Sequence, residues 1–153
     1  MPIIEQKIWI NAPIEICFDS ARNVGTHTKT LQTTKEEAVA GVTNGLMEEG
    51  DTVTWEAVHF GIRQRLTAKI TRMEKPHYFT DMMVKGAFSS FTHHHLFNQH
   101  AGGTMITDIF EYKSPFGLLG VLADKLFLEK YMRRLLFDRA ISLKKIAEND
   151  DEK

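Results

Sequence analysis

The sequence predicts an α+β domain in which a curved antiparallel sheet of seven strands wraps around one long C-terminal helix. Three observations support this prediction. A strand-like segment followed by helical signals opens the chain, strand-like segments recur between residues 35 and 113, and a helical stripe of apolar residues closes it. Strands grouped together, with helices at the ends of the run, are typical of antiparallel α+β architectures.

Size and composition narrow the class of protein. The chain has 153 residues, a net charge of −1 and one cysteine, Cys17. This length suits a single domain, which we place at residues 1–148, with a charged tail at 149–153. The small net charge gives no field that attracts nucleic acid, and no apolar run is long enough for a membrane helix. The lone cysteine and the absence of signal-peptide features predict a cytoplasmic protein without integral membrane association.

The N-terminal third alternates strand and helix. Ile3–Ile10 is rich in β-branched residues and predicts a strand, and Pro13 suits the first turn of a following helix. A second short helix is expected at about Thr26–Leu31. Lys35–Ala40 predicts a charged edge strand, and the glycine-rich segment Gly41–Gly50 predicts a mobile loop that could open over a pocket.

A run of antiparallel strands follows. Thr52–Phe60 and Arg63–Arg72 flank Gly61-Ile62, which we interpret as the two-residue turn of a hairpin. This turn pairs Trp55 with Ala68 on an apolar face of the hairpin. Further strands are predicted at Tyr78–Val84, Phe88–Asn98 and Thr104–Lys113.

The C-terminal segment Leu118–Ala147 predicts one continuous helix. Its apolar residues recur at helical spacing from Leu128 to Ile146. At about 1.5 Å per residue, such a helix would be about 45 Å long, enough to cross the whole sheet. Three basic residues on it, Lys130, Arg133 and Arg134, form a solvated face or, less expectedly, a contact for a partner or a membrane surface.

Alternation along the strands predicts which side chains face the helix. This inner face is mainly apolar, but it includes a polar cluster of two carboxylates and two histidines. We expect Asp81 to lie near His93, and Asp108 near His95, since buried charges need partners. Such pairs would raise the pKa values of the histidines.

Four interpretations of this cluster remain open. It is a satisfied structural network, a polar clamp for a ligand, an acid–base pair, or a metal site. The metal interpretation rests on His93 and His95, which lie on one face about 6.6 Å apart along the strand, with Asp81 or Asp108 as a third ligand. The pattern His-x-His is common by chance, and we predict no cofactor and assign no metal.

We predict a pocket between sheet and helix for a small hydrophobic or amphipathic molecule. The alternative is an aromatase/cyclase- or dehydratase-type enzyme in which His93, His95, Asp81 and Asp108 move protons. A second alternative is a protein or membrane interaction module. The predicted ligand-binding residues are Trp55, His59, Leu66, Phe79, Asp81, Phe91, His93, His95, Asp108, Phe110 and Tyr112.

Three segments resemble the Bet v 1-like, START-related superfamily, also called SRPBCC or polyketide cyclase/dehydrase-like proteins, and within it an uncharacterised bacterial branch. They are Val53–Gly61, Gly86–His95 and Leu122–Leu128, and the junction Ile10–Glu15 also looks like that superfamily's. The resemblance covers nearly the whole chain. It implies a helix-grip fold with a cavity for lipids, polyketides or similar molecules, and it does not imply catalysis. The branch often has His-Glu-His where this chain has His93-His94-His95.

Overall fold

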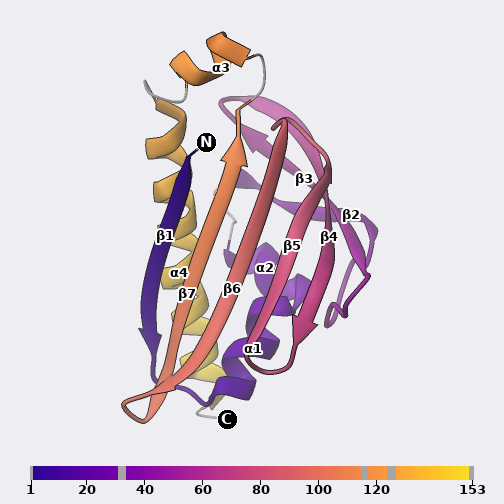
Figure 1. Cartoon of the computed structure of the whole chain (residues 1–153). Coiled ribbons are helices and arrows are strands. Elements are labelled where there is room, and N and C mark those ends of the chain that lie inside the picture. The colour runs from indigo at the N-terminus through magenta and orange to yellow at the C-terminus, as the bar shows by residue number, and fades with distance from the viewer. Residues whose placement is uncertain (1, 31–33, 115–116, 124–126, 152–153) are drawn as a thin grey trace.

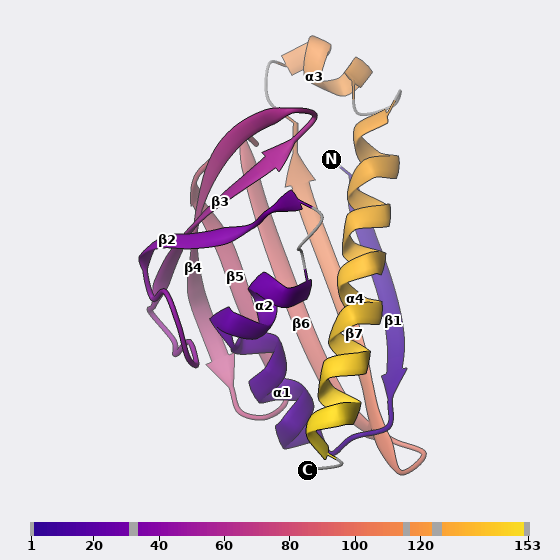
Figure 2. The same ribbon diagram turned by 180° about the vertical axis from the view of Figure 1, so that it is seen from behind.

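A computed structural model of the chain describes residues 2–30, 34–114, 117–123 and 127–151. Within these ranges, seven strands form one antiparallel sheet in the order β1-β7-β6-β5-β4-β3-β2. The sheet curves around the helices, which lie on its concave side (Figures 1 and 2). The strands are β1 Ile3–Ile10, β2 Glu37–Gly41, β3 Thr52–His59, β4 Ile62–Glu74, β5 Tyr78–Lys85, β6 Ser90–His100 and β7 Gly103–Lys113. The helices are α1 Ile14–Arg22, α2 Val24–Thr30, α3 Gly117–Ala123 and α4 Glu129–Asp151.

The predicted fold class is confirmed, including the edge position of β2 and the two short helices after β1. Pro13 is the N-cap of α1, where its missing N–H leaves no helical hydrogen bond unmade. The apolar face of α1, formed by Ile14, Cys17, Phe18 and Ala21, is buried against the sheet and α4. The predicted end of the second helix, Leu31, lies outside the described residues.

The hairpin between β3 and β4 corrects the predicted turn. The two turn residues are Phe60 and Gly61, both with positive φ, so His59 pairs with Ile62. Glycine therefore takes the second central position, as in Asn-Gly type I′ turns, and not the first. Trp55 pairs with Leu66 and not with Ala68. The register differs from the predicted one by two residues, and such a shift keeps every side chain on its predicted face.

The predicted single C-terminal helix is divided into α3 and α4. Figure 1 shows α3 beyond the end of the sheet, away from the main body of the fold. The apolar stripe that predicted the helix begins only at Leu128, so it belongs to α4 and to the residue just before it. At about 1.5 Å per residue the 23 residues of α4 span about 35 Å. The helix continues to Asp151, so charged residues expected in the tail extend it.

The position of α4 leaves room above the middle of the sheet. This helix packs chiefly against α1, α2 and β1, as Figure 2 also shows. One core cluster includes Phe18, Phe97 and Leu143, and a second includes Phe110 and Met132. Strands β3 to β6 curve away from the helix, and the space that this leaves is the cavity described next.

Candidate functional site

A cavity of about 300 Å³ lies between the concave face of the sheet and α4. Strands β3, β4, β6 and β7 contribute one wall, and α4 contributes the other. Most of the lining side chains are aromatic or aliphatic, and the polar ones include His27 of α2, Asp81 of β5 and His93 of β6. The α4 wall consists of Tyr131, Met132, Leu135, Leu136 and Arg139.

Seven of the eleven predicted ligand-binding residues line this cavity. They are Trp55, His59, Leu66, Asp81, Phe91, His93 and Phe110. The other four lie outside it. Phe79 and His95 line a smaller neighbouring cavity, and Asp108 lines another small one near α4. Tyr112 is fully buried in the core cluster with Phe91 and Phe110.

Sequence reasoning missed the α4 wall and two polar groups, His27 and Glu36. The apolar stripe of α4 was a usable signal, because the helix was expected to face the sheet. Arg139 interrupts that stripe and lines the cavity, yet nothing in its local sequence distinguishes it from the exposed Arg134. His27 and Glu36 come from a short helix and the segment before β2, where no alternation or helical stripe predicted which side faces inward.

The carboxylates and histidines of β5, β6 and β7 form one connected network. As predicted, Asp81 pairs with His93 and His95 with Asp108 in the backbone register. The side chains, however, also bond diagonally: Nε2 of His93 donates to Asp108 (3.2 Å), and Nε2 of His95 donates to Asp81 (3.3 Å). Nδ1 of His95 lies 3.1 Å from Asp108, so His95 lies between both carboxylates. The two imidazole rings stack with centroids 3.8 Å apart.

The two histidines differ in their electrostatics. Burial disfavours the charged form of His95, but its hydrogen bonds to Asp108 and Asp81 outweigh burial and raise its pKa. Burial and the neighbouring charge of His95 lower the pKa of His93 to about 4, against the opposing effect of Asp108. The expectation that both pKa values rise is therefore wrong for His93, which has one carboxylate partner and a charged neighbour.

Both carboxylates stay ionised. Burial opposes the charge of Asp81, but the hydrogen bond from His95 and nearby positive charge outweigh it and lower the pKa of Asp81 to about 2. Hydrogen bonds from His93 and His95 likewise overcome burial and hold the pKa of Asp108 well below its usual range. The network thus holds two negative charges, and these favour the protonated form of His95.

Arg139 is the cationic group of the α4 wall. Its side chain is half-buried and lines the main cavity and both smaller ones. Among the residues that the structure describes, no hydrogen bond or ion pair engages its guanidinium, although its charge lowers the pKa values of Asp81 and His27. A guanidinium offers five donors and no acceptor, so Arg139 is free to donate to a bound molecule.

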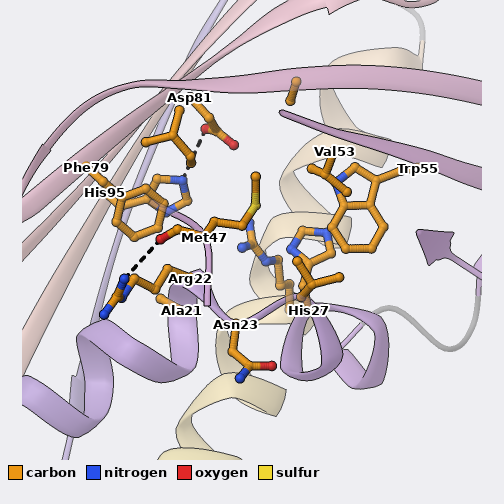
Figure 3. A pocket seen from close by; sticks show the side chains of 14 residues that line it. Ala21, Arg22, Asn23, His27, Met47, Val53, Trp55, Phe79, Asp81 and His95 are labelled. Carbon is orange, nitrogen blue, oxygen red and sulfur yellow. Dashed lines mark hydrogen bonds and ion pairs between the residues drawn. The ribbon is translucent and has the colours of Figure 1, made fainter. Parts of the chain in front are cut away.

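The smaller cavity, about 30 Å³, lies beside α1 and α2 (Figure 3). His27 stacks on Trp55 with ring centroids 4.2 Å apart, and Nε2 of His27 donates to Glu36 (2.8 Å). Met47 reaches this cavity from the glycine-rich loop, and Arg22 donates to its carbonyl oxygen (3.0 Å). The loop was expected as a lid over the pocket, but its residues do not line the main cavity and it is tied to α1.

Aromatic residues lie at the other end of the main cavity. The imidazole Nδ1 of His59 and the hydroxyl of Tyr131 are 2.6 Å apart and join β3 to α4. Phe60, at the hairpin turn, lies against Tyr131 and Phe127. Phe60 and Phe127 are more than half exposed, as are Leu119 and Leu122 of α3.

The predicted basic face of α4 is exposed. Lys130, Arg133 and Arg134 surround a shallow depression together with Gln6 and Phe137, and Arg133 forms an ion pair with Glu129 (3.0 Å). None of the described helices is long and apolar enough to cross a membrane. These observations fit the solvated face that the sequence favoured.

Comparison with solved structures shows that other proteins share this fold. TTHA0849 from Thermus thermophilus superimposes with a TM-score of 0.79 at 19% identity, covering 95% of this chain and 97% of that one. The ginseng major latex-like protein 151 from Panax ginseng gives 0.68 at 11% identity (95% and 97% covered). Ara h 8.0201 gives 0.65 at 13% identity (97% and 95% covered). No protein-family model and no curated protein sequence matches the chain.

Proposed function

We propose that this protein binds a small hydrophobic or amphipathic molecule in the cavity between the sheet and α4. The observation that carries the proposal is the cavity itself, about 300 Å³ in volume, with mainly apolar walls and a smaller number of polar groups among them. Small-molecule sites typically have this composition and volumes from about 300 to 1,000 Å³. The Bet v 1-like resemblance, which implies lipid, polyketide or similar ligands, points the same way.

Three of the polar groups, Arg139, Asp81 and His93, favour a ligand whose head both accepts and donates hydrogen bonds. Arg139 can only donate, and the ionised Asp81 can only accept. His93, uncharged near neutral pH because its pKa is low, has one ring nitrogen available to accept. A hydroxyl group, alone or next to a carbonyl, can bond to these groups, whereas a purely aliphatic molecule would give Arg139 and the accepting nitrogen of His93 no partner.

The proposal is tested by filling the cavity. Ala57 lines it from β3, and Val58, the next residue, points to the opposite face of the sheet. We expect the parent protein to bind one equivalent of a neutral solvatochromic dye such as Nile red. Ala57→Phe should weaken this binding at least tenfold, because a phenyl ring would occupy the cavity, and Val58→Phe should leave it unchanged. Equal binding by all three proteins would refute the proposal, as would no binding by the parent.

A further inference from the structure

We propose that Asp81, His93 and His95 form a binding site for a divalent transition-metal ion such as Zn²⁺. One ligand atom from each of these side chains lies within 4.8 Å of the others, on the adjacent strands β5 and β6. Imidazole nitrogens and a carboxylate oxygen are the donor set of three-ligand zinc sites. This inference goes beyond the proposed function and does not depend on it.

The distance between two of the ligands already suits a shared ion. Nε2 of His95 lies 3.3 Å from Oδ1 of Asp81, which is long for a charge-assisted hydrogen bond. Two atoms bonded to one tetrahedral Zn²⁺ at about 2.0–2.1 Å are about 3.4 Å apart. The His93 ligand atom lies within 4.8 Å of the other two, so it must move closer when an ion binds.

Asp108 supplies the outer support that metal-binding histidines need. It accepts from Nε2 of His93 (3.2 Å) and lies 3.1 Å from Nδ1 of His95, so one carboxylate orients both rings. Carboxylates in this position fix the ring orientation and make the ligand nitrogen more basic. Because Asp108 engages Nδ1 of His95, Nε2 of that ring points to Asp81 and is available to an ion bound there. Nδ1 of His93 has no hydrogen-bond partner among the described residues.

Burial and charge also favour an ion here. His93 and His95 are 4% and 3% exposed, so the site would be shielded from bulk water. Asp81 and Asp108 bring two negative charges to this interior, and a divalent cation that replaces the Nε2 proton of His95 would balance them. Arg139, which also lines the cavity, is the nearby positive charge that would oppose binding.

The site would keep a coordination position open to the main cavity. Asp81 and His93 line that cavity, while His95 is held behind them. Three protein ligands and an open fourth position distinguish exchangeable or catalytic zinc sites from closed structural ones. An oxygen atom of a bound molecule could occupy the fourth position.

The test is metal titration of the full-length protein after chelator treatment. We expect one equivalent of Zn²⁺ by calorimetry, and Co²⁺ should give the visible absorption of a low-symmetry nitrogen/oxygen site. Asp81→Asn and His93→Gln should abolish this binding. Asp108→Asn should weaken it about 10–100-fold, as loss of an outer-shell partner does. The matched control His94→Gln changes the outward-facing histidine between the ligands and should bind as the parent does.

No saturable uptake by the parent would overturn the proposal, and so would unchanged uptake by both Asp81→Asn and His93→Gln. If these variants do not fold, the site is tested on the parent protein by following its imidazole NMR signals during the Zn²⁺ titration. Zn²⁺ must shift the signals of His93 and His95, and shifts confined to the exposed His77 and His100 would overturn the site. Dye binding by the metal-free protein is measured separately, so failure of the metal site and failure of the cavity proposal remain distinguishable.

Discussion

At the scale of single residues, partners decide the charge of each buried histidine. His95 lies between two carboxylates and its pKa rises, whereas burial and the charge of His95 lower that of His93. Strand alternation predicted that these groups share one buried face, because the period of two needs no knowledge of the partner strand. It could not predict the diagonal hydrogen bonds, since these depend on the rotamers that stack the two rings.

His27 gives a pH-dependent contribution to stability. Burial and the charge of Arg139 lower its pKa below 6.5, against the opposing effect of Glu36. The unfolded chain therefore binds more protons at this position, so the stabilisation is complete above pH 6.5 and is lost as the pH falls through the folded pKa. We expect His27→Gln to lose less unfolding free energy than the parent between pH 7 and pH 5, measured by urea denaturation. The exposed His77→Gln should follow the parent, and equal slopes for all three proteins would contradict this account.

Arg22 is expected to anchor the loop between β2 and β3. Its guanidinium is buried and binds Asp19 (2.8 Å), Glu48 (2.7 Å) and the carbonyl oxygen of Met47 (3.0 Å). Arg22→Met should cost about 1–3 kcal/mol, because a buried carbonyl loses its donor. Arg72→Met, which removes a solvent-exposed pair with Glu74, should cost less than about 0.5 kcal/mol. Similar losses in thermal or urea unfolding would refute the anchoring role.

At the scale of secondary-structure elements, α4 closes the fold through one face. Leu143 and Ala147 are buried in the core cluster with α1 and β7, and Lys144 donates to the carbonyl oxygen of Trp9 (2.7 Å). The helical stripe predicted this face. The division into α3 and α4 was not predictable, because residues 118–123 are apolar throughout and mark no boundary before the stripe that begins at Leu128.

Truncating a buried residue of α4 should cost more unfolding free energy than truncating a larger but exposed one. Leu143 is 7% exposed, whereas Phe137, on a different face of the same helix, is 56% exposed. Leu143→Ala should therefore cost about 2–5 kcal/mol in unfolding free energy. Phe137→Ala should cost about 0.5 kcal/mol or less, although it removes more atoms. A larger loss from Phe137→Ala, measured by chemical denaturation, would show that this face is packed.

At the scale of the whole molecule, the cavity results from a mismatch between a curved sheet and a straight helix. α4 packs on α1, α2 and β1, and Figure 2 shows it beside β1 and β7, on the side of the sheet away from β3 and β4. The sequence predicted the layers and most of the strand wall. It could not predict the depth of the cavity, which depends on sheet curvature and on the register shifts between β4 and β5.

The central claim, that the space between the sheet and α4 receives an apolar molecule, is tested most directly by NMR titration with a neutral medium-chain alcohol. We predict saturable shifts for the methyl groups of Ala57, Ala68, Leu135 and Leu136, all of which line the cavity. The methyl groups of Val58, on the outer face of β3, should not shift. Shifts confined to the exposed Leu119 and Leu122 of α3, or no shift at the cavity methyls up to the solubility of the alcohol, would contradict the claim.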